Sequence, residues 1–79
     1  MLVLGDVVIK EDIFKGAPFI SGHGFFRVDG GDYHTTTPVI ALVMGILPGD
    51  ALEGTLYLLL VDGVFVTEVC RHLNTWKRL

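Results

Sequence analysis

The sequence has one cysteine, few charged residues and no apolar run long enough to cross a membrane. Because Cys70 has no second cysteine to pair with, an internal disulfide is excluded and a reducing compartment fits best. The longest apolar runs, residues 39–47 and 55–61, fall well short of the ~20 residues that a membrane-spanning helix needs. The beginning of the chain lacks a basic segment followed by a long apolar stretch, so no signal peptide is expected. We expect a soluble protein with no membrane partner.

Charged residues make up 19% of the 79-residue chain, whereas hydrophobic residues make up 51%. Disordered segments have the opposite composition, so this chain should fold. A domain this short has much surface and little interior, and some of its apolar side chains are therefore expected to face a partner. The net charge of −3 argues against a surface built to neutralise phosphate, so nucleic acid is not an expected partner.

The charges are unevenly distributed along the chain. All nine acidic residues lie within residues 1–68, whereas the last eleven residues carry Arg71, Lys77 and Arg78 and no acid. We interpret residues 70–79 as a basic C-terminal tail or a short helical turn, with Leu73 and Trp76 on one side at a spacing of three. Such a tail would either solubilise the chain or dock on an acidic neighbour.

Short β-rich runs separated by turn residues predict an all-β fold. Lys10 to Gly24 mixes charge with Pro18 and three glycines, which indicates one long irregular loop. Asp62-Gly63 between two β-rich runs is a strong indication of a two-residue hairpin turn. We expect one domain over residues 1–79, a small barrel or sandwich of about five to six mostly antiparallel strands. The expected strands are residues 2–9 (with a bulge or a bend at Gly5-Asp6), 25–28, 33–37, 39–47, 55–61 and 64–69.

The strand expected at residues 55–61 is apolar on both faces, with leucines at 56, 58 and 60 on one side. A strand buried on both faces needs cover on two sides, which predicts an oligomer or a docked partner. The alternative is closure into a small barrel, with the second face covered by the loop and the C-terminal segment. The predicted interface consists of Tyr57, Leu59, Val61, Phe65 and Trp76, with the basic residues Arg71, Lys77 and Arg78.

No constellation of residues indicates catalysis, a metal site or a cofactor. The histidines, His23, His34 and His72, lack the spacing of a zinc site. Cys70 follows an apolar strand and is interpreted as a core residue rather than a nucleophile. Residues 21–24 (SGHG) could bring backbone amides close to an anion, but they lack the phosphate-loop lysine and the G-x-S-x-G pattern. We therefore expect no enzyme; one that uses His23 or Cys70 is the minor alternative.

An apolar run ends in Gly45-Ile46-Leu47, and an acidic turn, an apolar strand, the Asp62-Gly63 turn and a β-branched strand follow before Leu73 and Trp76. This order resembles the C-terminal part of the small head decoration proteins of lambda-type tailed phages, over about half of the chain. The resemblance implies a β-rich body that assembles as a trimer on the capsid and cements its subunits. The family's long flexible N-terminal arm has no counterpart here, and Cys70-Arg71-His72 is not typical of the family.

Gly22-His23-Gly24-Phe25-Phe26, together with residues 2–6, is similar to the N-terminal β-domain of RNA exosome cap subunits. This second resemblance covers about thirty residues, and the S1-type RNA-binding domain expected next is missing. The leading interpretation is thus a non-enzymatic structural protein, a viral capsid decoration or cement protein on the virion surface. Its expected partners are copies of itself and a larger assembly such as a major capsid protein. The alternative is a cytoplasmic β-barrel module of an RNA-processing complex.

Overall fold

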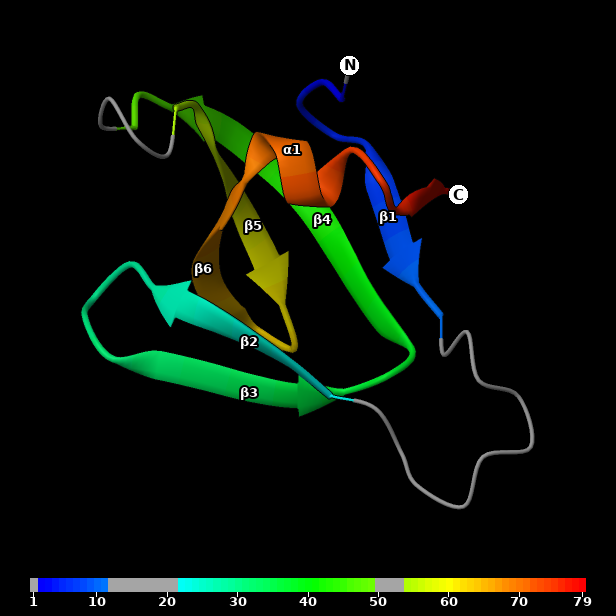
Figure 1. The fold of residues 1–79 in the computed structure, drawn as a ribbon, viewed down its shortest axis with the longest axis horizontal. Helices are drawn as coiled ribbons and strands as arrows, with labels where there is room; N and C mark the ends of the chain where they lie inside the picture. The colour runs from blue at the N-terminus through cyan, green and yellow to red at the C-terminus, as the bar shows by residue number, and fades with distance from the viewer. Residues whose placement is uncertain (1, 12–21, 50–53) are drawn as a thin grey trace.

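The computed structural model describes residues 2–11, 22–49 and 54–79. Within these residues, seven strands form one antiparallel sheet in the order β3-β2-β6-β5-β4-β1-β7 (Figure 1). The all-β prediction is confirmed, although the sheet has one strand more than expected and does not close into a barrel. The elements are β1 (Val7–Lys10), β2 (Gly22–Arg27), β3 (Asp32–Thr36), β4 (Val39–Leu47), β5 (Leu56–Val61), β6 (Val64–Val69), α1 (Cys70–Leu73) and β7 (Lys77–Arg78).

Three predicted boundaries are wrong near the beginning of the chain. The first strand starts at Val7 rather than at residue 2, because a turn precedes it: Gly5 has a φ of 90°, and Asp6 N–H donates to the Val3 carbonyl. The bend expected at Gly5-Asp6 is thus confirmed. The expected loop is shorter at both ends, since Lys10 belongs to β1 and residues 22–24 belong to β2. Residues 12–21 of that loop lie outside the described residues.

The strands on either side of the Asp62-Gly63 turn follow the prediction closely. Asp62 and Gly63 have φ values of 51° and 76°. Two successive positive φ values are the geometry of a type I′ hairpin turn, which glycine adopts without strain. β6 spans the predicted residues 64–69, and β5 begins one residue later than expected, at Leu56.

The core lies on the inner face of the sheet, the side that α1 covers (Figure 1). From β5 it receives Tyr57, Leu59 and Val61, all at most 1% exposed. The Tyr57 hydroxyl donates to the Leu2 carbonyl at 3.4 Å, and burial raises the pKa of this phenol above its ordinary value. The remaining buried hydrophobic residues are Leu2, Val8, Phe25, Val39, Ala41, Val43, Val66 and Leu73.

This core corrects the predicted interface. Tyr57, Leu59 and Val61 were expected to face a partner, but the chain's own residues enclose them. The prediction of two apolar faces on this strand is nevertheless right, because the leucines at 56, 58 and 60 are only half-buried on the opposite side. The face of β5 that remains accessible is therefore the opposite one, with Leu56, Leu58 and Leu60.

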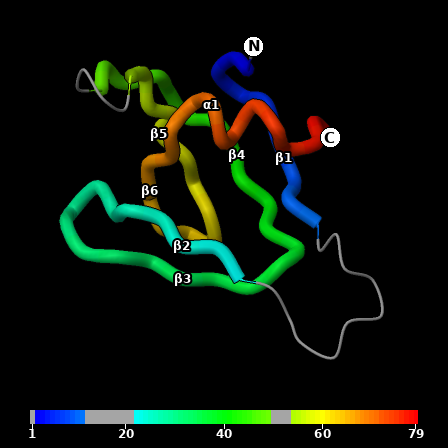
Figure 2. Tube along the Cα trace, viewed as in Figure 1, coloured from blue at the N-terminus to red at the C-terminus, as the bar shows by residue number. Residues whose placement is uncertain are grey.

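The C-terminal residues form a helical turn and a short strand rather than an irregular arm. Leu73 in α1 is fully buried, and β7 pairs with β1 through Lys77 beside Ile9 and Arg78 beside Val8. Figure 2 shows this last segment running along the edge of β1 that does not pair with β4. The helical turn covers only Cys70–Leu73, Trp76 lies beyond its end, and the chain end is part of the sheet.

Candidate functional site: the outer face of the sheet

The side of the sheet opposite the core carries apolar side chains on its central strands. Leu60 lies beside Leu42 on β4 and beside Phe65 on β6. One row further along, Phe26 lies beside Thr67, and Thr67 beside Leu58. We define the outer face as Phe26, Val28, Ile40, Leu42, Gly45, Leu47, Leu56, Leu58, Leu60, Phe65 and Thr67.

This outer face is exposed although it is apolar. Phe26 is 68% exposed, Ile40 53% and Phe65 49%. An antiparallel sheet with one solvated face ordinarily places polar side chains there. None of the side chains in the outer face is charged. Charged side chains border it: Asp32 on β3 pairs with Phe26, and Arg27 and Asp29 lie at the end of β2. Arg71 lines a hollow together with Phe26 and Thr67.

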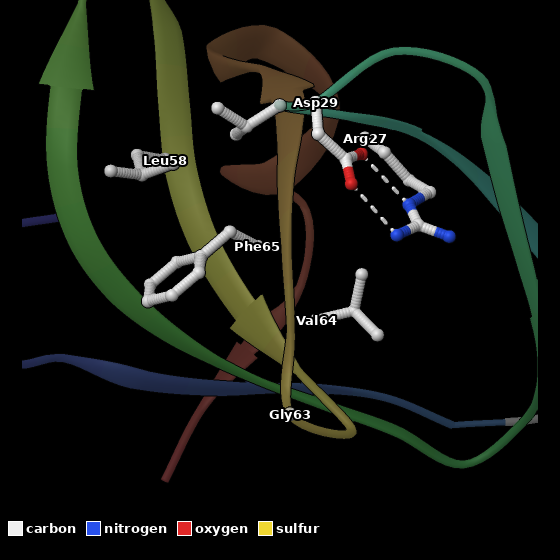
Figure 3. A pocket seen from close by; sticks show the side chains of 7 residues that line it. Arg27, Asp29, Leu58, Gly63, Val64 and Phe65 are labelled. Atoms are coloured by element: carbon white, nitrogen blue, oxygen red, sulfur yellow. Dashed lines mark hydrogen bonds and ion pairs between the residues drawn. The ribbon is translucent and has the colours of Figure 1, made fainter.

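A hollow of about 390 Å³ borders this face near the turn between β5 and β6 (Figure 3). In Figure 3, Phe65 and Leu58 lie on one side of β6, and Val64 and Arg27 lie on the other. At its rim, Arg27 Nε and Nη2 donate to the two carboxylate oxygens of Asp29 at 3.0 and 2.9 Å. This exposed pair adds little stability, but it makes the rim electrically neutral. The hollow therefore suits an apolar or neutral group.

A second cluster lies on the inner side, and we call it the polar clasp: Lys10, His23, Glu68 and His72. The Lys10 ammonium donates to His23 Nδ1 at 3.0 Å, and His23 Nε2–H donates to Glu68 Oε2 at 2.7 Å. In this arrangement Nδ1 accepts and Nε2–H donates, so the imidazole lies between the Lys10 ammonium and the Glu68 carboxylate. The other carboxylate oxygen, Oε1, accepts from the Val69 amide at 2.9 Å and lies 3.5 Å from His72 Nδ1. The Glu68 side chain is 10% exposed.

The polar clasp joins two strands that lie far apart in the curled sheet. Lys10 is on β1 and His23 on β2, and three strands separate β1 from β2 in the sheet. Side-chain contacts thus close the gap that strand pairing leaves open. The His23 ring also packs 4.5 Å from Phe25 and 5.3 Å from Trp76, measured between ring centroids. Both ring nitrogens of His23 are thus engaged within the clasp.

The clasp borders a hollow of about 360 Å³ that also includes Arg71. Within the described residues, no group of three histidine, cysteine, aspartate or glutamate side chains is arranged to hold a metal ion. Cys70 is half-buried at the start of α1. None of these observations indicates a nucleophile beside the clasp.

The remaining residues of the predicted interface lie apart from one another. Phe65 is on the outer face, whereas Trp76 packs against the core on the inner side. Arg71 is exposed on α1, and Lys77 and Arg78 lie on β7, four strands away from β6. Arg78 also lies 3.4 Å from the Asp6 carboxylate. The predicted apolar and basic surfaces therefore do not form one site.

Sequence analysis missed Phe26, Ile40 and Leu58 as members of the exposed face. The position of Phe26 next to Phe25 could have indicated its exposure. Adjacent residues of a strand point to opposite faces, so only one of the two phenylalanines can lie in the core. Ile40 carries a weaker signal, because it stands in a run that is apolar or glycine from residue 39 to residue 47.

No known protein family, curated protein or solved structure matches this chain. The likeness of residues 39–76 to head decoration proteins thus remains a prediction from sequence. Among the described residues, no helix has the length and apolar character needed to cross a bilayer.

Proposed function

We propose that this chain is a non-enzymatic assembly protein that packs the outer face of its sheet against other protein surface. The observation that carries the proposal is the exposure of large uncharged side chains on the outer face, where Phe26, Ile40 and Phe65 are each about half exposed or more. Such a surface is costly in water and becomes favourable when a partner covers it. The core on the inner face already stabilises the fold, so the outer side chains are free to serve a contact.

The size of the outer face limits how tightly it can bind. Its exposed large side chains present on the order of 500 Å², taking an aromatic side chain as roughly 150–250 Å². Covered by an equal area of a partner, this gives about 1,000 Å² of buried surface in total, near the lower limit for a specific interface, and association itself costs about 4–15 kcal/mol. A single contact is therefore weak. Repetition over a lattice multiplies weak contacts through avidity, which favours a role in a large assembly.

The surface of a viral particle is the setting that we propose for this assembly. The support for it is the resemblance of residues 39–76 to phage head decoration proteins, together with a contact that needs repetition to be strong. Its partners would be copies of the chain and a larger shell protein. The alternative, a module of an RNA-processing complex, is electrostatically disfavoured: Arg27 is paired with Asp29, and the outer face carries no cation.

A photo-crosslinking amino acid placed at Phe65 tests the proposal, with the same group at Thr75 as the control. Phe65 is half exposed on the outer face, whereas Thr75 is exposed on the side of α1. In native cells or particles, irradiation should give discrete crosslinked protein species from position 65 and few from position 75. Equal crosslinking at both positions would show that the outer face is not a docking surface.

A further inference from the structure

We infer that two copies of this chain pack outer face to outer face about a two-fold axis that runs along the strands, between β5 and β6. The inference rests on the proposed function and names its first partner, a second copy of the chain. Aligned packing of two sheets is a common arrangement, in which the strands of the two sheets cross at about −30°. What favours a second copy over another apolar partner is the order of side-chain sizes across the outer face.

One row of the outer face is complementary to itself. Four neighbouring strands contribute Phe26 (β2), Thr67 (β6), Leu58 (β5) and Gly45 (β4), each beside the next in the register. Rotation about an axis between β6 and β5 reverses this row. Phe26 of one copy then lies over Gly45 of the second copy, and Thr67 lies over Leu58 of the second copy. Each large side chain meets a small one, which is the condition for close packing between two faces.

Space above Gly45 is the key element of this match. Apart from its neighbours in the chain, Met44 and Ile46, a Cβ placed on Gly45 would meet only the Leu58 side chain, at 3.9 Å, which is ordinary van der Waals contact. The outer face therefore dips at Gly45, whereas Phe26 stands 68% exposed three strands away. With adjacent strands about 4.8 Å apart, the projection and the dip are separated by about 14 Å, with the axis midway between them.

The neighbouring row is apolar on both sides of the same axis. It contains Val28, Phe65, Leu60 and Leu42, since the Val28 amide donates to the Phe65 carbonyl and Leu60 pairs with Phe65 and Leu42. Rotation places Val28 over Leu42 and Phe65 over Leu60 of the second copy. No charge is brought against another charge in either row, so the contact buries no unpaired ion.

The curl of the sheet restricts this contact to its central strands. An interface of about 500 Å² per copy buries on the order of 1,000 Å² in total, which is near the lower limit for a specific interface. We therefore expect a dimer with a dissociation constant in the micromolar range. Analytical ultracentrifugation of the full chain from a few micromolar to several hundred micromolar should show a reversible shift from one to two copies.

A size-swap experiment tests the pairing of Phe26 with Gly45. Phe26→Ala removes the projection, and Gly45→Leu fills the dip; each alone should weaken the dimer at least about tenfold, as expected for a residue that is well packed in an interface. The double variant again places a large side chain over a small one, and it should recover most of the loss. Leu79→Asp is the matched control, because Leu79 is 67% exposed on the far edge beyond β7 and should leave the dimer unchanged.

Three results would overturn the inference: a wild-type chain that stays monomeric at several hundred micromolar, a double variant weaker than both single variants, or equal loss in Leu79→Asp. If circular dichroism shows that Gly45→Leu does not fold, Phe26→Asp replaces the size swap, because this exposed position tolerates a charge in the monomer. A dimer of unchanged affinity in Phe26→Asp would then refute the pairing. The crosslinking experiment separates the two proposals. A monomeric chain that still crosslinks at position 65 keeps the docking face but excludes the second copy.

Discussion

Leu58 and Leu59 are adjacent leucines on β5, and truncating each to alanine should have very different effects on stability. Leu59 is fully buried on the inner face, so Leu59→Ala should cost about 2–5 kcal/mol through lost burial and the cavity left behind. Leu58 is half-buried on the outer face, and Leu58→Ala should cost about 1 kcal/mol. A domain of 79 residues has a total unfolding free energy of about 4–12 kcal/mol, so the first change removes a large part of it.

Urea unfolding followed by Trp76 fluorescence measures this difference. With a slope of about 1 kcal/mol per molar urea for so small a domain, Leu59→Ala should lower the midpoint by about 2 M or more, and Leu58→Ala by about 1 M. The protein is kept at a few micromolar, because dimer formation would stabilise the folded state. In the ultracentrifuge the order reverses: Leu58→Ala should weaken self-association. Equal midpoints for the two variants would mean that the two faces of β5 are buried alike, which would refute the assignment of faces.

Two further predictions concern polar contacts. The Asp62 carboxylate accepts a hydrogen bond from the Tyr33 hydroxyl at 2.7 Å and raises the pKa of that phenol above 10.0; Asp62→Asn should lower the Tyr33 pKa toward 10.0 in an absorbance titration of tyrosinate, and an unchanged value would contradict the contact. In the polar clasp, Glu68→Leu leaves the His23 Nε2–H without its acceptor and should cost about 1–3 kcal/mol in urea unfolding, whereas Glu68→Gln, which retains an acceptor, should cost less. Equal losses in these two variants would show that His23 does not depend on Glu68.

Local signals in the sequence predicted the hairpin of β5 and β6 almost to the residue. Asp62 and Gly63 carry the positive φ values that this turn needs, and few residue pairs adopt them so readily. β4 begins and ends where its apolar run does, at Val39 and Leu47. In each case neighbouring residues determine the geometry, so no knowledge of the distant chain was required.

The choice of face on β5 could not be made from the sequence. Alternation shows that Tyr57 and Leu58 point to opposite sides, but both sides of this strand are apolar. Contacts with distant segments determine which face of β5 is buried. The Leu2 carbonyl accepts a hydrogen bond from the Tyr57 hydroxyl, and Leu73 of α1 completes the core on the same side. The pairing of β1 with β7, which draws the C-terminal residues away from a free tail, likewise joins segments about seventy residues apart.

The β-bulge in β4 links this limit of prediction to the proposed dimer. Val43 pairs with Leu59, but the next partner of Leu58 is Gly45, so one residue is skipped at Met44. Without the bulge Met44 would stand beside Leu58, and the outer face would have a long side chain where it now has a dip. Residues 39–47 are apolar or glycine throughout, so they show no alternation of polar and apolar residues that a bulge would interrupt. The bulge therefore cannot be recognised in the sequence. The same uniformity that hides the bulge leaves both faces apolar, so the position of one skipped residue decides whether the outer face can receive Phe26 of a second copy.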